Sequence, residues 1–396
     1  MPWRKSDPVS ERLEFVRRLE EGERVVDLCH EFGISRKTAY KLKERYEELG
    51  PRGLFDRSRA PRTIPHRTPP EVEDLLAATR QEHPTWGPKK IRAWLLRQKP
   101  GTNVPCSSTI GDILNRRGLL VRRKRRRTPM PHGSPLRTAS APNDIWCADF
   151  KGQFRLGSGR YCYPLTISDR FSRYLICCEA LEGTYVDTAM VVFDQAFREY
   201  GLPTVIRTDN GCPFAAPGLW GLSKLSARWL RLGVWPERIE PAHPEQNGQH
   251  ERMHLVLKQE TTRPAGENFL QQQERFDYFT DQYNHDRPHE ALGQRPPADF
   301  YAKSSRQLPK ELPEPEYPMH DVVRQVSTNG DVRLSQHERF FLSGVLAGES
   351  VGLREVDDGH WLVSFMQLDL GHYDCSTKLF EAIGTQPPEV TPTETA

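Results

Sequence analysis

The chain has 396 residues, of which 36% are hydrophobic and 28% charged, and its mean hydropathy is −0.69. A chain of this length is long enough for two to four domains. It contains no apolar run near the roughly 18 residues of a membrane span and no apolar segment of a secretory signal at its start, so we expect a cytoplasmic protein without a membrane partner. The eight cysteines are scattered and form no CxxC pair, which favours reduced, structural thiols.

The net charge of +3 hides an uneven distribution of charge along the chain. Residues 1–140 contain 31 Lys and Arg and 17 Asp and Glu, a net charge of +14, whereas residues 141–396 contain the remaining 25 and 36, a net charge of −11. A basic first third indicates a polyanionic partner for that part of the chain. The acidic remainder indicates a function that uses carboxylates, such as metal binding.

Residues 1–60 are predicted to form a helix-turn-helix domain of three short helices. Apolar residues recur at helical spacing in 10–22 and 24–32, and a glycine-containing turn then leads to a basic helix over 35–50. Ser35 is placed to cap this helix, and Gly50 to end it. In such a motif the start of the last helix enters the major groove of DNA. The residues expected to contact bases or phosphates are Ser35, Arg36, Lys37, Thr38 and Tyr40.

The pattern repeats in residues 61–120, which are predicted to form a second helix-turn-helix domain. Ser107 is expected to cap its last helix and to contact DNA. A basic linker, 121–142, follows and contains six cations in seven residues. Such a run is expected to track DNA phosphates, which makes binding depend steeply on salt. The cations are Arg122, Arg123, Lys124, Arg125, Arg126 and Arg127.

Residues 143–303 are predicted to form an α/β domain with a mixed sheet. Three segments rich in aromatic and β-branched residues, 144–156, 160–171 and 173–181, indicate a meander of strands. Helices and strands then alternate, which predicts helices packed on the sheet. A linker over 304–319 leads to 320–383, whose alternating pattern and "NG" and "DG" turns predict a small all-β barrel. The composition of 384–396 predicts a disordered tail.

Three acids stand out by their positions in this predicted α/β domain. Asp149 lies inside the first strand, where an acid without a partner is costly. Asp209 follows a buried strand, and Glu251 lies in the first turn of a helix that begins after "HPEQNG". On a helical wheel, Glu251 points away from the apolar stripe that Met253 and Leu257 form. Each acid also has a structural explanation: an ion pair, a turn cap, and a favourable place at a helix N-terminus.

Taken together, these motifs resemble a known family. The segments "WCADF", "TDNG", "HPEQNGQHER" and "YNHDRPHEALGQRPP" resemble the DDE integrase core of insertion-sequence transposases of the IS481/IS3 type and of retroviral integrases. The resemblance implies a ribonuclease-H-like fold over 143–303, with Asp149, Asp209 and Glu251 as the catalytic acids and metal ligands. The spacing from Asp209 to Glu251 is longer than usual in the family, and the surplus lies at "PGLWGLSKLS", residues 217–226.

The resemblance also implies a reaction and its partners. Two Mg²⁺ or Mn²⁺ ions, which prefer carboxylate oxygens, would help water to cut at the element end and the freed 3′-hydroxyl to attack target DNA. The partners are then the terminal inverted repeats, target DNA and further copies of the chain, as a dimer or tetramer in a synaptic complex, associated with the bacterial nucleoid. Further DNA or active-site contacts are expected from Asn210, Gln246, Asn247 and Lys258.

Several alternatives remain open at this point. Glu245 is the second choice for the third acid. His243 and His250 are interpreted as a loop and a helix-surface residue instead of metal ligands, because hard cations prefer oxygen. Two other functions are a DNA-binding regulator that no longer catalyses and a nuclease of the same fold that cuts without joining.

Overall fold

The computed structural model describes residues 7–57, 67–120, 136–240 and 243–383. The chain divides into two compact units, Met1–Arg67 and Thr68–Ala396, and each is described by itself. The predicted tail over 384–396 and the cations of 122–127 lie outside the described residues. Within the described part of the chain, no helix is long and apolar enough to cross a membrane.

The first unit is a three-helix domain, as predicted. Its helices are α1 (Pro8–Glu20), α2 (Val25–Glu31) and α3 (Arg36–Leu49). They enclose a small core that includes Phe15, Leu28 and Leu42. The Ser35 side chain accepts a hydrogen bond from the Thr38 backbone amide at 3.2 Å, which confirms the predicted cap of α3. Gly50 ends the helix with a φ of 59°, a conformation that favours glycine.

The second unit begins with another three-helix arrangement. It consists of α4 (Pro70–Glu82), α5 (Pro88–Gln98) and α6 (Ser107–Arg116). Leu76, Ile91 and Ile110 lie in its core and are fully buried. The predicted cap at Ser107 is wrong by one residue. Cys106 occupies the cap position, so Ser107 is already helical, and no side chain caps the helix.

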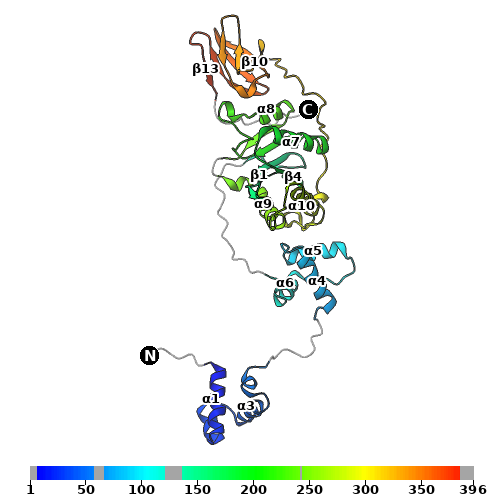
Figure 1. Cartoon of the computed structure of the whole chain (residues 1–396), viewed down its shortest axis with the longest axis vertical. Helices are drawn as coiled ribbons and strands as arrows, with labels where there is room; N and C mark the ends of the chain where they lie inside the picture. Colours follow the sequence, from blue (N-terminus) through cyan, green and yellow to red (C-terminus); the bar gives the residue numbers. More distant parts are fainter. Residues whose placement is uncertain (1–6, 58–66, 121–135, 241–242, 384–396) are drawn as a thin grey trace. The chain divides into compact units, whose positions relative to one another are not determined.

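A six-stranded mixed sheet forms the centre of the second unit (Figure 1). In it, β1 pairs antiparallel with β3 and parallel with β5; β3 also pairs with β2 and β4, and β5 with β6. The strands are β1 (Ile145–Phe150), β2 (Phe154–Arg155), β3 (Tyr161–Asp169), β4 (Leu175–Leu181), β5 (Val205–Thr208) and β6 (Trp235–Arg238). This confirms the predicted meander and the mixed sheet.

Helices cover both faces of this sheet (Figure 1). Trp146 and Ile167 pack with Phe193 of α7 and Trp229 of α8 on one face. Cys178 packs with residues of α9 and α10 on the other. The helices are α7 (Val186–Tyr200), α8 (Lys224–Arg231), α9 (Gly248–Thr261) and α10 (Phe269–Asp281). Among these, α8 was not predicted as a helix from the sequence.

The C-terminal strands form open sheets, so the predicted barrel is not what they build. Five strands pair in the order β13-β12-β11-β10-β7, and β8 pairs only with β9. The strands are β7 (Val322–Gln325), β8 (Asp331–Arg333), β9 (Arg339–Phe341), β10 (Ser350–Asp357), β11 (His360–Phe365), β12 (Leu368–Asp374) and β13 (Leu379–Ala382). The edge strands β7 and β13 have four residues each and do not pair with one another.

Residues from the central domain contribute to the core of these sheets. Trp220 and Leu230 belong to the same buried cluster as Val351 and Val363. The Trp220 indole donates a hydrogen bond to the Asp369 carbonyl at 2.8 Å. The surplus segment 217–226 therefore supplies part of the apolar packing that a closed barrel would supply from its own strands.

Candidate functional site

Asp149 is the fifth residue of β1, opposite Thr166 of β3. Its side chain is 23% exposed. Burial, and then the negative charges of Asp209 and Glu251, raise the pKa of Asp149 to about 7. The strand therefore holds this carboxyl group where two other acids act on it electrostatically.

Asp209 reaches the same edge of the sheet from the neighbouring strand. The parallel register pairs Ile145 with Val205 and Cys147 with Arg207, so two residues further on Asp209 comes level with Asp149. The Asp209 side chain accepts a hydrogen bond from the Gly211 amide at 3.1 Å, which orients the carboxylate in its turn. The carboxyl ends of parallel strands are where α/β sheets commonly place ligand sites.

Glu251 lies in the first turn of α9, which contacts β1. The side chain is exposed, whereas Met253 and Leu257 on the other side of the helix are buried. The helical wheel predicted this orientation. Glu245 lies in the short 3-10 helix η3 (Pro244–Asn247) that precedes α9.

Two buried histidines of α9 lie beside Asp149, and sequence analysis assigned neither to the site. His254 Nδ1 is 3.6 Å from Asp149 Oδ2, and its Nε2 is 2.6 Å from the Thr166 hydroxyl. His250 Nε2 is 2.7 Å from the same hydroxyl, which also donates to the Asp149 carbonyl at 3.1 Å. The interpretation of His250 as a helix-surface residue is therefore wrong, because it is only 2% exposed.

Burial lowers the pKa of His250 to about 3 and that of His254 to about 2. Both imidazoles are therefore neutral near pH 7. They connect to Asp149 through the Thr166 hydroxyl, and His254 also through its contact with the carboxyl group at 3.6 Å. In the sequence, His250 directly precedes Glu251 and His254 follows it by three residues, but the low hydropathy of histidine is typical of surface residues.

The four secondary residues differ in what they contact. The Asn210 side chain donates to the Ile239 carbonyl, and the Gln246 side chain accepts from the Glu240 amide, each at 2.8 Å. Asn247 is buried, and its side-chain oxygen has no hydrogen-bond partner among the described residues. Lys258 is exposed, and its charge is one cause of the lowered pKa of Lys151, after burial. The hydrogen bonds of Asn210 and Gln246 therefore stabilise the segment around 239–240, after β6.

The residues predicted to contact DNA in α3 are accessible. Ser35, Arg36, Lys37, Thr38 and Tyr40 are all exposed, and Tyr40 is 58% exposed although it is aromatic. Ser107 at the start of α6 is partly buried.

The three acids provide oxygen donors of the kind that Mg²⁺ and Mn²⁺ prefer. Among the described residues, no three His, Cys, Asp or Glu side chains lie close enough together to hold one ion. The mutual repulsion of the acids, which contributes to the raised pKa of Asp149, fits a divalent cation, because a bound cation would relieve it. If such a cation binds, its candidate ligands are Asp149 and Asp209 at the sheet edge and the exposed Glu251 of α9.

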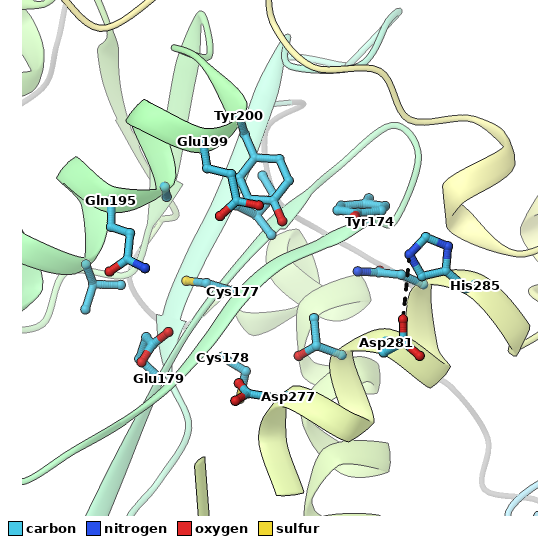
Figure 2. A pocket seen from close by; sticks show the side chains of 15 residues that line it. Tyr174, Cys177, Cys178, Glu179, Gln195, Glu199, Tyr200, Asp277, Asp281 and His285 are labelled. Carbon is cyan, nitrogen blue, oxygen red and sulfur yellow. Dashed lines mark ion pairs between the residues drawn. The ribbon is translucent and has the colours of Figure 1, made fainter. Parts of the chain in front are cut away.

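An acidic cavity of about 330 Å³ lies between β4, α7 and α10 (Figure 2). Glu179, Glu199, Asp277 and Asp281 are among its lining residues. Burial, and then the charge of Asp277, raise the pKa of Glu179. None of the three acids above lines this cavity, so it is separate from the candidate site.

Family models match most of the chain in sections. A helix-turn-helix domain matches residues 11–62, and a homeodomain-like domain matches 38–114. Two models of the integrase core domain match 139–244 and 232–297.

Curated relatives include proteins of two insertion elements. The chain is 29% identical over 235 residues to the "Insertion element IS476 uncharacterized 39.2 kDa protein" of Xanthomonas euvesicatoria, which covers 57% of this chain and 63% of that protein. It is 28% identical over 246 residues to the "Insertion element IS407 uncharacterized 31.7 kDa protein" of Burkholderia multivorans. This alignment covers 59% of this chain and 83% of that protein.

Two solved structures also align with the chain. They are the HTLV-2 integrase catalytic core domain in complex with magnesium, at 14% identity and a TM-score of 0.34, and the simian T-cell lymphotropic virus intasome, at 16% and 0.37. The first covers 42% of this chain and 100% of that chain, the second 75% and 97%. The sequence matches show that the chain has helix-turn-helix and integrase core domains and is similar to proteins of insertion elements, which supports an insertion-sequence transposase with an integrase core.

Proposed function

We propose that the protein binds the terminal inverted repeats of its insertion sequence, cuts their 3′ ends and joins those ends to target DNA. The observation that carries the proposal is the placement of the three acids: Asp149 lies in β1, Asp209 follows the parallel strand β5, and Glu251 lies in α9, which contacts β1. Consistent with this placement, the charges of Asp209 and Glu251 add to burial in raising the pKa of Asp149. Three acids that act on one another in this way suit a site that holds divalent cations.

In this proposal Asp149, Asp209 and Glu251 hold two divalent ions. Bound there, the ions supply charge neutralisation at the phosphate and lower the pKa of the attacking oxygen. The chain itself orients the donors: β1 and β5 fix the two aspartates, and α9 presents the glutamate. The attacking group is water in the cut and the freed 3′-hydroxyl in the joining step, with no covalent protein intermediate. We further propose that a dimer or tetramer brings the two element ends together.

The proposal is tested with labelled duplexes of the element ends, incubated with the full chain in Mg²⁺ and, separately, in EDTA. We expect cleavage at the 3′ ends in Mg²⁺ only. Absence of cleavage, with specific binding intact, would instead support a regulator that no longer catalyses.

His254→Ala is expected to lower cleavage by about 10–100-fold, the usual cost of losing a residue that orients a metal ligand. The Mg²⁺ concentration that gives half-maximal cleavage should rise, because Asp149 loses the contact at 3.6 Å. A merely structural loss would lower the melting temperature without moving this Mg²⁺ midpoint. His243→Ala, in the loop before α9, is the control and should leave the midpoint unchanged.

Arg36→Ala and Lys37→Ala are expected to reduce sequence preference, because these exposed residues open α3. Each lost base contact costs about 1–3 kcal/mol on element-end DNA and little on scrambled DNA. The measurement is a pair of binding titrations of the full chain in EDTA, with Lys43→Ala, near the middle of the same helix, as the control. Equal losses on both duplexes would contradict a base-reading role for these two residues.

A further inference from the structure

A cavity of about 520 Å³ beside α9 is lined by thirteen residues, six of which are cationic or histidine. They come from α5, from the turn between β3 and β4, from α9 and from the segment after α10. We call this cavity the basic pocket. Its cationic and histidine lining residues are Lys90, Arg170, Arg173, Arg252, Arg287 and His289.

Few acidic groups compensate this charge. Arg287 is paired with Glu260 at 2.9 Å, and the one acid that lines the pocket, Glu290, is paired with Lys89 at 2.8 Å. Lys90, Arg170, Arg173 and Arg252 form no ion pair with any residue in the described ranges. Burial, and then the charge of Arg287, lower the pKa of Lys90 to about 7.

The hydrogen-bonding capacity of the pocket is also incomplete. Arg170 Nη1, Arg173 Nε and His289 Nε2 are buried and have no hydrogen-bond partner within the described part of the chain. Buried donors without acceptors are costly. A ligand that brings several anionic oxygens would satisfy the arginine donors and neutralise the excess charge at the same time.

The basic pocket is lined by residues of two elements to which a function is proposed, α5 and α9. Gln249, Arg252 and Val256 line it from one side of α9, whereas Glu251 and Lys258 lie on the other side of the same helix. Lys90 comes from α5 of the second helix-turn-helix domain. The pocket thus contains side chains of a DNA-binding type of domain and of the helix that carries the third acid.

We propose that the basic pocket binds backbone phosphates of a DNA strand that extends from the second helix-turn-helix domain to the acids at α9. The inference rests on the proposed function, since it assigns the strand to element-end DNA. Phosphates suit the pocket because its arginines lie around one cavity, where anionic oxygens can accept hydrogen bonds from several of them at once. Phosphate contacts in this pocket are expected to raise the affinity for element-end and scrambled DNA to the same extent.

The test is the double variant Arg173→Gln/Arg252→Gln in the full chain, with a mixed-sequence duplex and EDTA throughout. We expect affinity at low salt to fall at least tenfold, and the slope of log affinity against log salt to become shallower by about 1.8, or ~0.9 for each of two lost phosphate contacts. The control is Arg155→Gln/Arg198→Gln, which removes two exposed arginines outside the pocket and should change the slope much less. Equal changes in both variants would overturn the proposal.

The identity of the ligand is tested by a photoreactive p-benzoylphenylalanine at Ala291, which lines the pocket. Crosslinking to the labelled duplex supports DNA, whereas crosslinking to a second copy of the chain overturns it. Inorganic phosphate, added at constant ionic strength, should not displace the duplex; displacement would instead indicate a site for free phosphate. All these measurements are made without metal, so they do not depend on cleavage. A chain that never cuts DNA can still show that the basic pocket binds DNA phosphates.

Discussion

Asp149→Asn, Asp209→Asn and Glu251→Gln are each expected to abolish DNA cleavage and joining while leaving DNA binding nearly unchanged. Each replacement keeps the side-chain volume and removes one anionic donor from the proposed metal site. If that site contributes ~4 kcal/mol to the reaction, the rate falls about a thousandfold. The measurement is cleavage of labelled element ends in Mg²⁺, with binding to the same duplex measured in EDTA.

Glu245→Gln is the matched control for the third acid, because Glu245 precedes α9 by three residues and carries the same charge. It should retain most of the cleavage activity. A severe loss in Glu245→Gln with a mild one in Glu251→Gln would show that the wrong acid is assigned. Near-normal joining in any of the three triad variants would remove that residue from the site.

Glu237→Leu is expected to lower the free energy of unfolding by about 3–5 kcal/mol, because it leaves a buried arginine without its counter-ion. Arg207 is fully buried in β5, and its Nε donates to Glu237 Oε2 at 2.5 Å. Since Asp209 follows two residues later, the loss should also lower cleavage. The measurement is denaturant unfolding of the full chain followed by tryptophan fluorescence, alongside the cleavage assay.

The double variant Arg207→Met/Glu237→Leu is the control, because it removes the buried charge together with its partner. Replacing a buried ion pair by apolar side chains of similar size is often close to neutral. The double variant should therefore be more stable than Glu237→Leu alone. A single variant as stable as the wild type would show that this ion pair contributes nothing to the fold.

Much of the central domain was predictable because its strands and helices have strong local patterns. The aromatic and β-branched residues in 144–181 and the buried strand before Asp209 correctly indicate β1, β3, β4 and β5. The parallel pairing of β1 and β5 then brings two acids 60 positions apart to one edge of the sheet. The orientation of Glu251 followed from the period of its helix.

Other features depend on contacts between distant segments and have no local signal. The burial of His250 and His254 results from packing against Thr166 and Ser168 of β3. The C-terminal sheet stays open while Trp220 and neighbouring residues complete its core, which the strand pattern alone does not reveal. The basic pocket gathers cations from four separate segments. Helix α8 begins after the glycine- and tryptophan-containing stretch 217–223, where the sequence shows no helical pattern. Its N-cap is the last residue of that stretch, Ser223.

The proposed joining activity is measured by transfer of a labelled element end to a plasmid target. The full wild-type chain is incubated with a pre-cut element end and supercoiled plasmid, in Mg²⁺ and in EDTA. We expect the label to become covalently attached to the plasmid in Mg²⁺ only, and Asp149→Asn to show no attachment. Plasmid that is nicked in Mg²⁺ but never acquires the label would contradict the account and identify a nuclease that cuts without joining.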